Sequence, residues 1–331
     1  YAQELKMPFY AHGLDGVIRQ QEFKLRGVLN GIDMQEYDPA ADPLIPAHYS
    51  AQDLSGRAQC KAALQQSLGL TVDPSVPIIG MVGRLSSQKG LDLVDHVIGQ
   101  IMEENVQLVV LGMGESRYVN LFSWAEQQYP GRVAARFQMD HQLAHRIYAG
   151  ADMFLMPSQF EPCGLSQMIA LRYGCVPIVR ETGGLRDTVL SYNHYNNAGN
   201  GFTFFNYNAH DMLFTIRRAL RYYHEHPDVW RELQSRGMNG DYSWNASAET
   251  YLSLYMSILP GAQNALPVEM PTPVAVQAEQ AAEEMPALEK EEITEKPAKP
   301  VRKPRAKKPA DAGAEKPAPK TRAKKAEKPA E

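Results

Sequence analysis

Cysteine is scarce in this chain, with three among 331 residues. Cys60, Cys163 and Cys175 have neither the spacing of a disulfide framework nor that of a metal site, which excludes a disulfide-stapled domain and fits a reducing compartment. No run approaches the ~20 apolar residues that a transmembrane helix needs, and no stretch has the pattern of a signal peptide. We therefore expect a soluble, cytoplasmic protein without a membrane partner.

Aromatic residues are absent beyond about residue 261, where Ala, Pro, Lys and Glu dominate. Such a segment cannot bury enough apolar surface to offset the entropy lost on ordering, so residues 261–331 are predicted to form a disordered tail. Residues 261–289 are acidic and residues 290–331 are strongly basic. A solvated extension is the favoured interpretation, attraction of the basic part to a polyanion is the alternative, and the partner of the tail is unknown.

Two nucleotide-binding signatures are also missing. No strand is followed by Gly-x-Gly-x-x-Gly with an acidic residue at the next strand end, and there is no Walker lysine loop, which excludes a dinucleotide-dependent dehydrogenase and a P-loop NTPase. The net charge is −4, and residues 1–260 are mildly acidic, so binding of nucleic acid is not expected. His12, His141 and His145 have no matched carboxylate or cysteine and are interpreted as surface or capping residues. We expect neither a metal nor another cofactor.

From Pro77 onward, short apolar runs alternate with segments of helical spacing. Strands are expected over 78–83, 106–112, 133–139, 152–157, 176–179 and 201–205. Helices are expected over 55–68, 91–102, 117–128, 142–148, 165–173, 185–190, 209–224, 228–237 and 247–259. An earlier strand is expected within 24–33, ending at an Asn30-Gly31 turn. Strands joined by helices of this length form a parallel sheet, so the predicted fold class is α/β, a Rossmann-like parallel sheet with helices on both faces.

The loop after the strand over 152–157 contains Glu161, and Gly164 precedes the next helix. In a parallel sheet this position is the carboxyl edge, where ligands usually bind, and the free amides of a helix start favour an anion. The pattern indicates a ligand site. A surface carboxylate near a helix N-terminus is the alternative.

Two more loops follow strands at the same expected edge. In 83–90, Arg84 and Lys89 lie between a strand end and a helix start, and two cations with helix-terminal amides suit a diphosphate. In 180–185, Thr182 precedes Gly183 and Gly184, which let backbone amides approach a ligand closely. The alternatives are a basic surface loop and an ordinary turn. Together with Glu161, the loops predict a site for a nucleotide diphosphate and an attached polar group.

Several long motifs, in order, resemble the bacterial glycogen synthase and plant starch synthase family. They are GRLSSQKG at 83–90, SQFEPCGLSQ at 158–167 and RETGGLRDTV at 180–189, with GLDG at 13–16 and LNGID at 29–33. The resemblance covers about residues 1–259. It implies two Rossmann-like domains facing across a cleft, the GT-B architecture, of which this sequence is similar to the C-terminal one. It also implies transfer of glucose, with retention, from ADP-glucose, or UDP-glucose in some relatives, to the non-reducing end of an α-1,4-glucan.

The matching positions carry the roles that this resemblance implies. Glu161 would be the catalytic carboxylate beside the donor sugar, and Arg84 and Lys89 would hold the diphosphate and stabilise its growing charge as the glycosidic bond breaks. The other donor-binding residues implied are Met139, Cys163, Gly164, Leu165, Thr182, Gly183 and Gly184. Met139 stands where many members carry an aromatic residue near the adenine, which leaves the base preference open.

The N-terminal domain of the family, with its Lys-Thr-Gly-Gly-Leu loop, is almost wholly absent. We therefore expect an N-terminally truncated fragment that is inactive alone. Residues 1–45 would be the end of that domain and the crossover, 46–242 the nucleotide-sugar domain, and 243–260 a final helix packing back toward the N-terminal domain, before the tail. Two alternatives stay open. One is another retaining transferase of this architecture, disfavoured by Ile169 where many such relatives have a second Glu, and the other is a non-catalytic binding module with a polyanion-binding tail.

Overall fold

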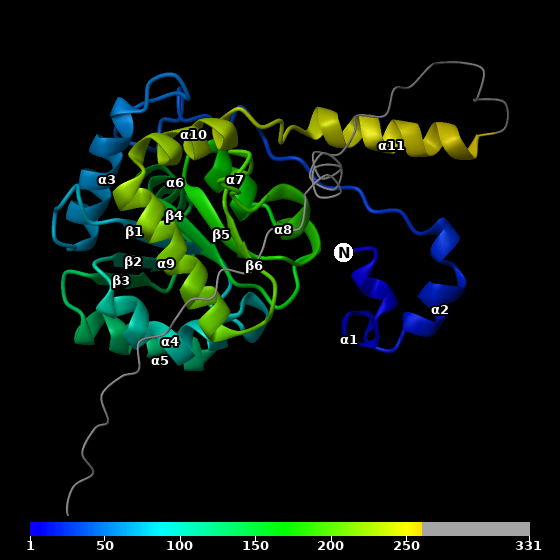
Figure 1. Cartoon of the computed structure of the whole chain (residues 1–331), viewed down its shortest axis with the longest axis horizontal. Coiled ribbons are helices and arrows are strands. Elements are labelled where there is room, and N and C mark those ends of the chain that lie inside the picture. The colour runs from blue at the N-terminus through cyan, green and yellow to red at the C-terminus, as the bar shows by residue number, and fades with distance from the viewer. Residues whose placement is uncertain (260–331) are drawn as a thin grey trace, which may run out of the picture. The chain divides into compact units, whose positions relative to one another are not determined.

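The computed structural model describes residues 1–259, and the predicted tail at 261–331 lies outside the described residues. The described part contains a parallel sheet with helices on both faces, as the sequence predicts (Figure 1). Among these residues, no helix combines the length and the apolar character needed to cross a membrane.

Six parallel strands form the sheet in the order β3-β2-β1-β4-β5-β6. Their bounds are β1 Ile78–Val82, β2 Gln107–Leu111, β3 Val133–Arg136, β4 Met153–Met156, β5 Val176–Arg180 and β6 Phe202–Phe204. Because helices cover both faces, the central strands are apolar on both sides rather than alternating with polar residues. The sequence prediction of six strands is confirmed, with β3 ending three residues earlier than expected.

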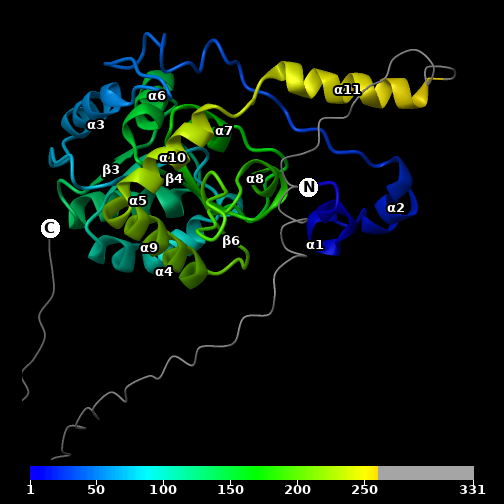
Figure 2. The same ribbon diagram turned by 45° about the horizontal axis from the view of Figure 1, so that its top comes forward.

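The helices that cover the sheet lie in two groups on its two faces. Helices of the first group are α4 Leu91–Glu103, α5 Ser116–Gln128 and α9 Ala209–Glu225; those of the second are α3 Ser55–Leu68, α6 His141–Gly150, α7 Ser166–Arg172 and α8 Gly183–Thr188. Ile79 of β1 and Met153 of β4 face the first group. Their sequence neighbours in the same strands, Ile78 and Phe154, face the second. In both Figure 1 and Figure 2, α4, α5 and α9 lie close together. Helix α10, Pro227–Met238, contacts both core clusters.

The strand order reverses between β1 and β4. From β1 the chain proceeds outward through β2 and β3, then returns to place β4 on the other side of β1. Gly80 of β1 pairs with Phe154 of β4, so the carboxyl ends of these two strands lie side by side. In open parallel sheets, the crevice at such a switch point is where ligands bind.

A set of buried ions fastens the opposite, amino-terminal edge of the same strands. Asp152 precedes β4, and its carboxylate accepts a hydrogen bond from the Ile78 amide at 2.8 Å and one from Lys61 Nζ at 2.8 Å. The buried Arg57 guanidinium, also on α3, donates to the carbonyls of Ala151 and Tyr173, just before β4 and β5. Helix α3 therefore supplies the charges that close this edge.

Residues 1–24 form only short helical segments. These are η1 Glu4–Lys6, α1 Pro8–Ala11, α2 Asp15–Gln20 and η2 Glu22–Lys24, and a further short 3₁₀ segment, η3 Ser87–Lys89, follows β1. The strand predicted within 24–33 is wrong, because this segment makes a single bridge, from Ile32 to Ser243. Gly31 is required by that contact rather than by a turn: a Cβ there would lie 2.4 Å from the Trp244 backbone nitrogen.

Helix α11, Trp244–Ile258, begins at a Ser243 side-chain cap. The Ser247 hydroxyl donates to the Leu29 carbonyl at 2.7 Å, so the start of α11 is fixed to the same extended segment. Tyr251, Tyr255 and Ile258 form an apolar stripe along α11 that does not pack on the sheet, because these side chains are exposed in the described part of the chain. What covers this stripe stays a prediction.

Candidate functional site

Glu161 lies in the loop after β4, at the switch point, and is only 7% exposed. Its Oε2 atom accepts a hydrogen bond from Lys89 Nζ at 2.5 Å and one from the Ser158 hydroxyl at 3.2 Å. Because Lys89 follows β1, this ion pair spans the two strand ends between which the sheet order reverses. The structure thus brings together two residues that the sequence assigned to one site from 72 positions apart.

One backbone and one side-chain hydrogen bond hold the two loops in this arrangement. The Gln159 amide donates to the Gln88 carbonyl at 2.8 Å, and Gln88 Nε2 donates to the Phe160 carbonyl at 3.1 Å. Gly90 has a φ of +71°, and a Cβ there would lie 1.9 Å from the Pro157 carbonyl oxygen. A side chain at Gly90 would therefore separate the loops that carry Lys89 and Glu161.

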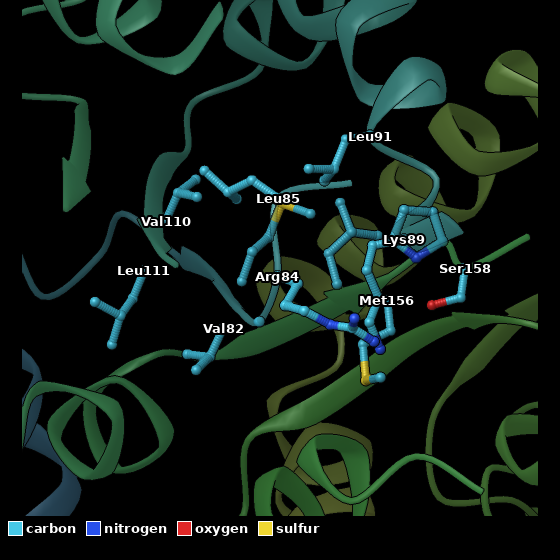
Figure 3. Close-up of a pocket in the computed structure, with 13 residues that line it drawn as sticks. Val82, Arg84, Leu85, Lys89, Leu91, Val110, Leu111, Met156 and Ser158 are labelled. Carbon is cyan, nitrogen blue, oxygen red and sulfur yellow. The ribbon is translucent and has the colours of Figure 1, made fainter. Parts of the chain in front are cut away.

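Arg84 is exposed beside this pair, and no residue in 1–259 forms a hydrogen bond or ion pair with its guanidinium. Figure 3 shows Arg84, Lys89 and Ser158 on the wall of a cavity of about 30 Å³ between the strand ends. Ligand pockets for drug-sized molecules measure roughly 300 Å³ or more, so this cavity alone does not enclose a nucleotide sugar. A donor would have to lie across the open edge.

The third predicted loop packs directly against the Glu161 loop. The Gly184 amide donates to the Glu161 carbonyl at 2.9 Å, and a Cβ at Gly184 would lie 2.0 Å from the Cys163 carbonyl oxygen. At Gly183, where φ is +45°, a Cβ would lie 2.0 Å from the Glu161 carbonyl oxygen. The two glycines thus serve close packing of one site loop on another, a role that the sequence analysis did not give them.

A carboxylate occupies the start of α8. Glu4, from the first helical segment, accepts hydrogen bonds from the Gly183 amide at 2.7 Å and from the buried Thr182 hydroxyl at 3.1 Å. The amide and hydroxyl predicted to face donor oxygens therefore already bind a carboxylate in this chain. Nothing in the local sequence around Glu4 indicates this contact, which connects residues 178 and 179 positions apart.

The buried Gln167 side chain holds the turn after Glu161 by hydrogen bonds to its backbone. Gln167 Nε2 donates to the carbonyls of Cys163 at 3.1 Å and of Gly164, which has a φ of +71°, at 2.9 Å. The Cys163 thiol is half-buried; burial raises its pKa, a hydrogen bond from the Asn30 amide opposes the shift, and the charge of Glu161 adds to it. Leu165 is exposed at the end of the turn.

Met139 is separate from these contacts. It lies in the loop after β3, two strands away from β1, and is 93% exposed. The loop is at the expected edge of the sheet, but no contact joins Met139 to the other predicted site residues in the described chain. Its role beside the base stays a prediction.

Other residues that position the site were missed by the sequence analysis. Arg180, at the end of β5, donates to the Gln159 carbonyl at 2.7 Å, and Gln88 and Ser158 hold the same loop. Arg180, Gln88 and Ser158 all belong to the motifs that carried the family resemblance, so their sequence signal was their membership of those motifs.

The interpretation of His141 and His145 as histidines without a matched carboxylate was wrong. His145 Nδ1 lies 2.8 Å from Asp42 Oδ2, and His141 Nε2 lies 3.4 Å from Glu36 Oε1. These carboxylates come from the loop at 33–42, about a hundred residues earlier, so local spacing could not reveal the pairs.

Residues 69–233 match the family model described as Glycosyl transferases group 1. The chain belongs to this family. Within this glycosyl transferase family it is 49% identical over 259 residues to a glycogen synthase of Clostridium novyi, covering 78% of this chain and 54% of that protein. It is 52% identical to a glycogen synthase of Geobacillus thermodenitrificans, covering 78% and 53%.

A solved structure agrees with these relatives. The catalytic domain of starch synthase IV from Arabidopsis thaliana, bound to ADP and acarbose, has 38% identity and a TM-score of 0.73, covering 78% of this chain and 54% of that one. The resemblance to glycogen and starch synthases is therefore confirmed for this chain. The chain spans about half the length of the curated relatives that it matches.

Proposed function

We propose that this chain forms the donor side of a glycogen synthase, which transfers glucose from ADP-glucose to the non-reducing end of an α-1,4-glucan with retention. The observation that carries the proposal is the Lys89–Glu161 pair at the switch point of the sheet, with the Arg84 guanidinium beside it. Glycogen synthase relatives and a starch synthase that was solved with ADP and acarbose support the assignment.

The charges suit the breaking of a glycosyl–diphosphate bond. An ammonium has three N–H donors, and within residues 1–259 Lys89 uses one, on Glu161, so two are free for phosphate oxygens. Arg84 adds a planar guanidinium that can bind two phosphate oxygens at once. As the bond breaks, negative charge collects on the diphosphate next to these cations, while Glu161 favours positive charge on the sugar.

Glucosyl transfer also requires a surface that binds the glucan, and we assign it to the half of the relatives that this chain does not span. In this proposal residues 1–45 lead from that half, residues 46–242 hold the donor, and α11 packs back on it with Tyr251, Tyr255 and Ile258. Burial of three large exposed side chains would stabilise that contact. A cytoplasmic location belongs to the same proposal.

Binding of ADP-glucose tests the proposal with this chain alone, because it does not need the glucan-binding half of the relatives. We expect calorimetric titration of the chain with ADP-glucose to show saturable binding that is at least about tenfold weaker in Lys89→Met, because a charged hydrogen bond to phosphate is lost. Lys24→Met, at an exposed lysine, is the matched control. Absence of saturable binding, or equal affinity in Lys89→Met, would contradict the assignment, and parallel titration with UDP-glucose measures the base preference.

A further inference from the structure

Helix α6 carries two histidines one turn apart, facing the loop that contains Glu36 and Asp42. His145 is 1% exposed, and its Nδ1 atom lies 2.8 Å from Asp42 Oδ2. Asp42 Oδ2 also accepts the Tyr173 hydroxyl at 2.6 Å. The second ring nitrogen of His145, Nε2, is buried and has no hydrogen-bond partner among the described residues.

The contacts of His145 assign its tautomer. Asp42 is an acceptor, so the proton of a neutral imidazole sits on Nδ1, and the lone pair of Nε2 is left without a donor to satisfy it. A buried polar atom without a partner is costly and is uncommon in native proteins. A carboxylate that orients one nitrogen of a histidine while the other nitrogen is free is the arrangement that supports metal-binding histidines.

Two more donor groups converge on this imidazole. The His141 and His145 rings have centroids 4.4 Å apart, and His141 Nε2 lies 3.4 Å from Glu36 Oε1. One ligand atom from each of Glu36, His141 and His145 lies within 4.8 Å of the other two. The His141 and Glu36 side chains are 61% and 44% exposed, so both can move by the small amount that a shared ion requires, whereas His145 is fixed.

We propose that Glu36, His141 and His145 form a binding site for a divalent transition-metal ion of the Zn²⁺ class. Two histidines at positions i and i+4 on one helix face are the spacing used by zinc-binding helices. Two imidazoles and one carboxylate leave a fourth tetrahedral position for water. Ca²⁺ and Mg²⁺ are disfavoured, because they prefer oxygen ligands and this set offers one carboxylate.

Such an ion would join the loop at 33–42 to α6. Other contacts between this loop and α6 are those of Asp42 and the stacking of Tyr37 on His145, with ring centroids 5.0 Å apart, and just after the loop Arg146 donates to the Leu44 carbonyl at 3.2 Å. Met139, predicted to lie near the base of the donor, is two residues before His141. Because a change at His141 could also disturb Met139 and so donor binding, the test measures metal binding and stability directly rather than glucosyl transfer.

The experiment uses the full 331-residue chain, stripped with a chelator and titrated with Zn²⁺ in competition with a chromophoric chelator. We expect one equivalent of Zn²⁺ to bind and to raise the melting temperature, with at least tenfold weaker binding in His141→Ala and in Glu36→Gln. Substitution with Co²⁺ should give the visible absorption of a tetrahedral ion, and His141→Ala should lose it.

His210→Ala is the matched control, since His210 belongs to a second exposed histidine pair, with His96, whose ring centroids lie 5.6 Å apart. We expect this variant to bind Zn²⁺ as the parent chain does. Failure of the parent chain to bind one equivalent, or unchanged affinity in His141→Ala, would overturn the proposal. His141→Ala and Glu36→Gln change exposed side chains and leave the buried His145–Asp42 contact in place. If their melting temperatures without metal match that of the parent chain, misfolding does not explain weaker binding.

Discussion

Two lysine–carboxylate pairs lie at opposite ends of β4. At the amino-terminal edge, Lys61 contacts Asp152 at 2.8 Å and also donates to the Pro74 carbonyl and the Tyr223 hydroxyl, both at 3.0 Å. At the carboxyl edge, Lys89 contacts Glu161 at 2.5 Å and donates to no other group in residues 1–259. The first lysine uses all three of its N–H donors on the protein, and the second uses one.

The difference separates an ion pair that closes the structure from one that leaves capacity for a ligand. Both carboxylates are nearly buried, so burial alone does not distinguish the two ends. The number of unused donors does, together with Arg84, which has no ionic partner in the described chain. Four measurements test this difference between the two ends of β4.

Loss of Lys61 should have the largest effect. Lys61→Met leaves the buried Asp152 carboxylate without its cation, and breaking one side of a buried pair costs about 3–5 kcal/mol. We expect the midpoint of urea unfolding to fall accordingly. Lys24→Met, at an exposed lysine, should change the free energy of unfolding by less than about 0.5 kcal/mol. A small loss for Lys61→Met would show that the amino-terminal pair is not structural.

Loss of the Glu161 charge should act on turnover rather than on folding. In this chain fused to the matching half of a glycogen synthase relative, Glu161→Gln should lower kcat for glucosyl transfer by about 10²–10³-fold, because a preorganised charge at the reacting sugar is removed. The melting temperature should fall less than in Lys61→Met, since the amide keeps the shape of the side chain and the Lys89 side chain is 23% exposed, so water can hydrate its ammonium. Glu126→Gln is the control, because Glu126 lies on α5 and forms an ion pair with Arg136 of β3 away from the site. Turnover equal to that of the parent would rule out the role assigned to Glu161.

Loss of Arg84 should have a smaller effect, on donor affinity alone and not on stability. Because its guanidinium binds no group in residues 1–259, Arg84→Ala should leave the unfolding midpoint unchanged and weaken ADP-glucose binding by about tenfold, the value of one charged hydrogen bond. Arg231→Ala, at an exposed arginine on α10, should alter neither quantity. A stability loss in Arg84→Ala without a change in donor affinity would place this arginine with the structural residues.

Thiol labelling compares the two edges with the least disturbance. Cys175 precedes β5 at the amino-terminal edge, and burial raises its pKa to about 12, so its thiolate is scarce at neutral pH and closed to reagent. Cys163 is half-buried in the Glu161 loop. We expect an alkylating reagent, followed by mass spectrometry, to modify Cys163 before Cys175, and ADP-glucose to slow the reaction at Cys163. Equal rates at the two cysteines would mean that the amino-terminal edge opens as readily as the site.

The sheet could be predicted from sequence because its strands are buried on both faces and appear as short continuous apolar runs between helical segments. The site loops could be predicted because strand ends carry Glu161 and Lys89 to one edge. The strand within 24–33 could not be excluded from sequence. The glycine that suggested a turn at Asn30-Gly31 in fact allows close contact with Ser243 and Trp244, which lie more than 200 residues later. The contacts of Glu4 with Thr182 and of Asp42 with His145 connect distant segments, and local patterns carry no signal for them.

The position of α3 has a practical consequence for where this domain can be cut. The family match begins at residue 69, directly after α3 ends, yet α3 supplies Arg57 and Lys61 to the edge of the sheet. A truncated chain starting at residue 69 would lack Arg57 and Lys61. The Asp152 carboxylate and the carbonyls of Ala151 and Tyr173 would then lose their cationic partners. The cooperative folding unit therefore extends upstream of the recognisable family boundary, and a soluble domain for expression should begin before residue 55.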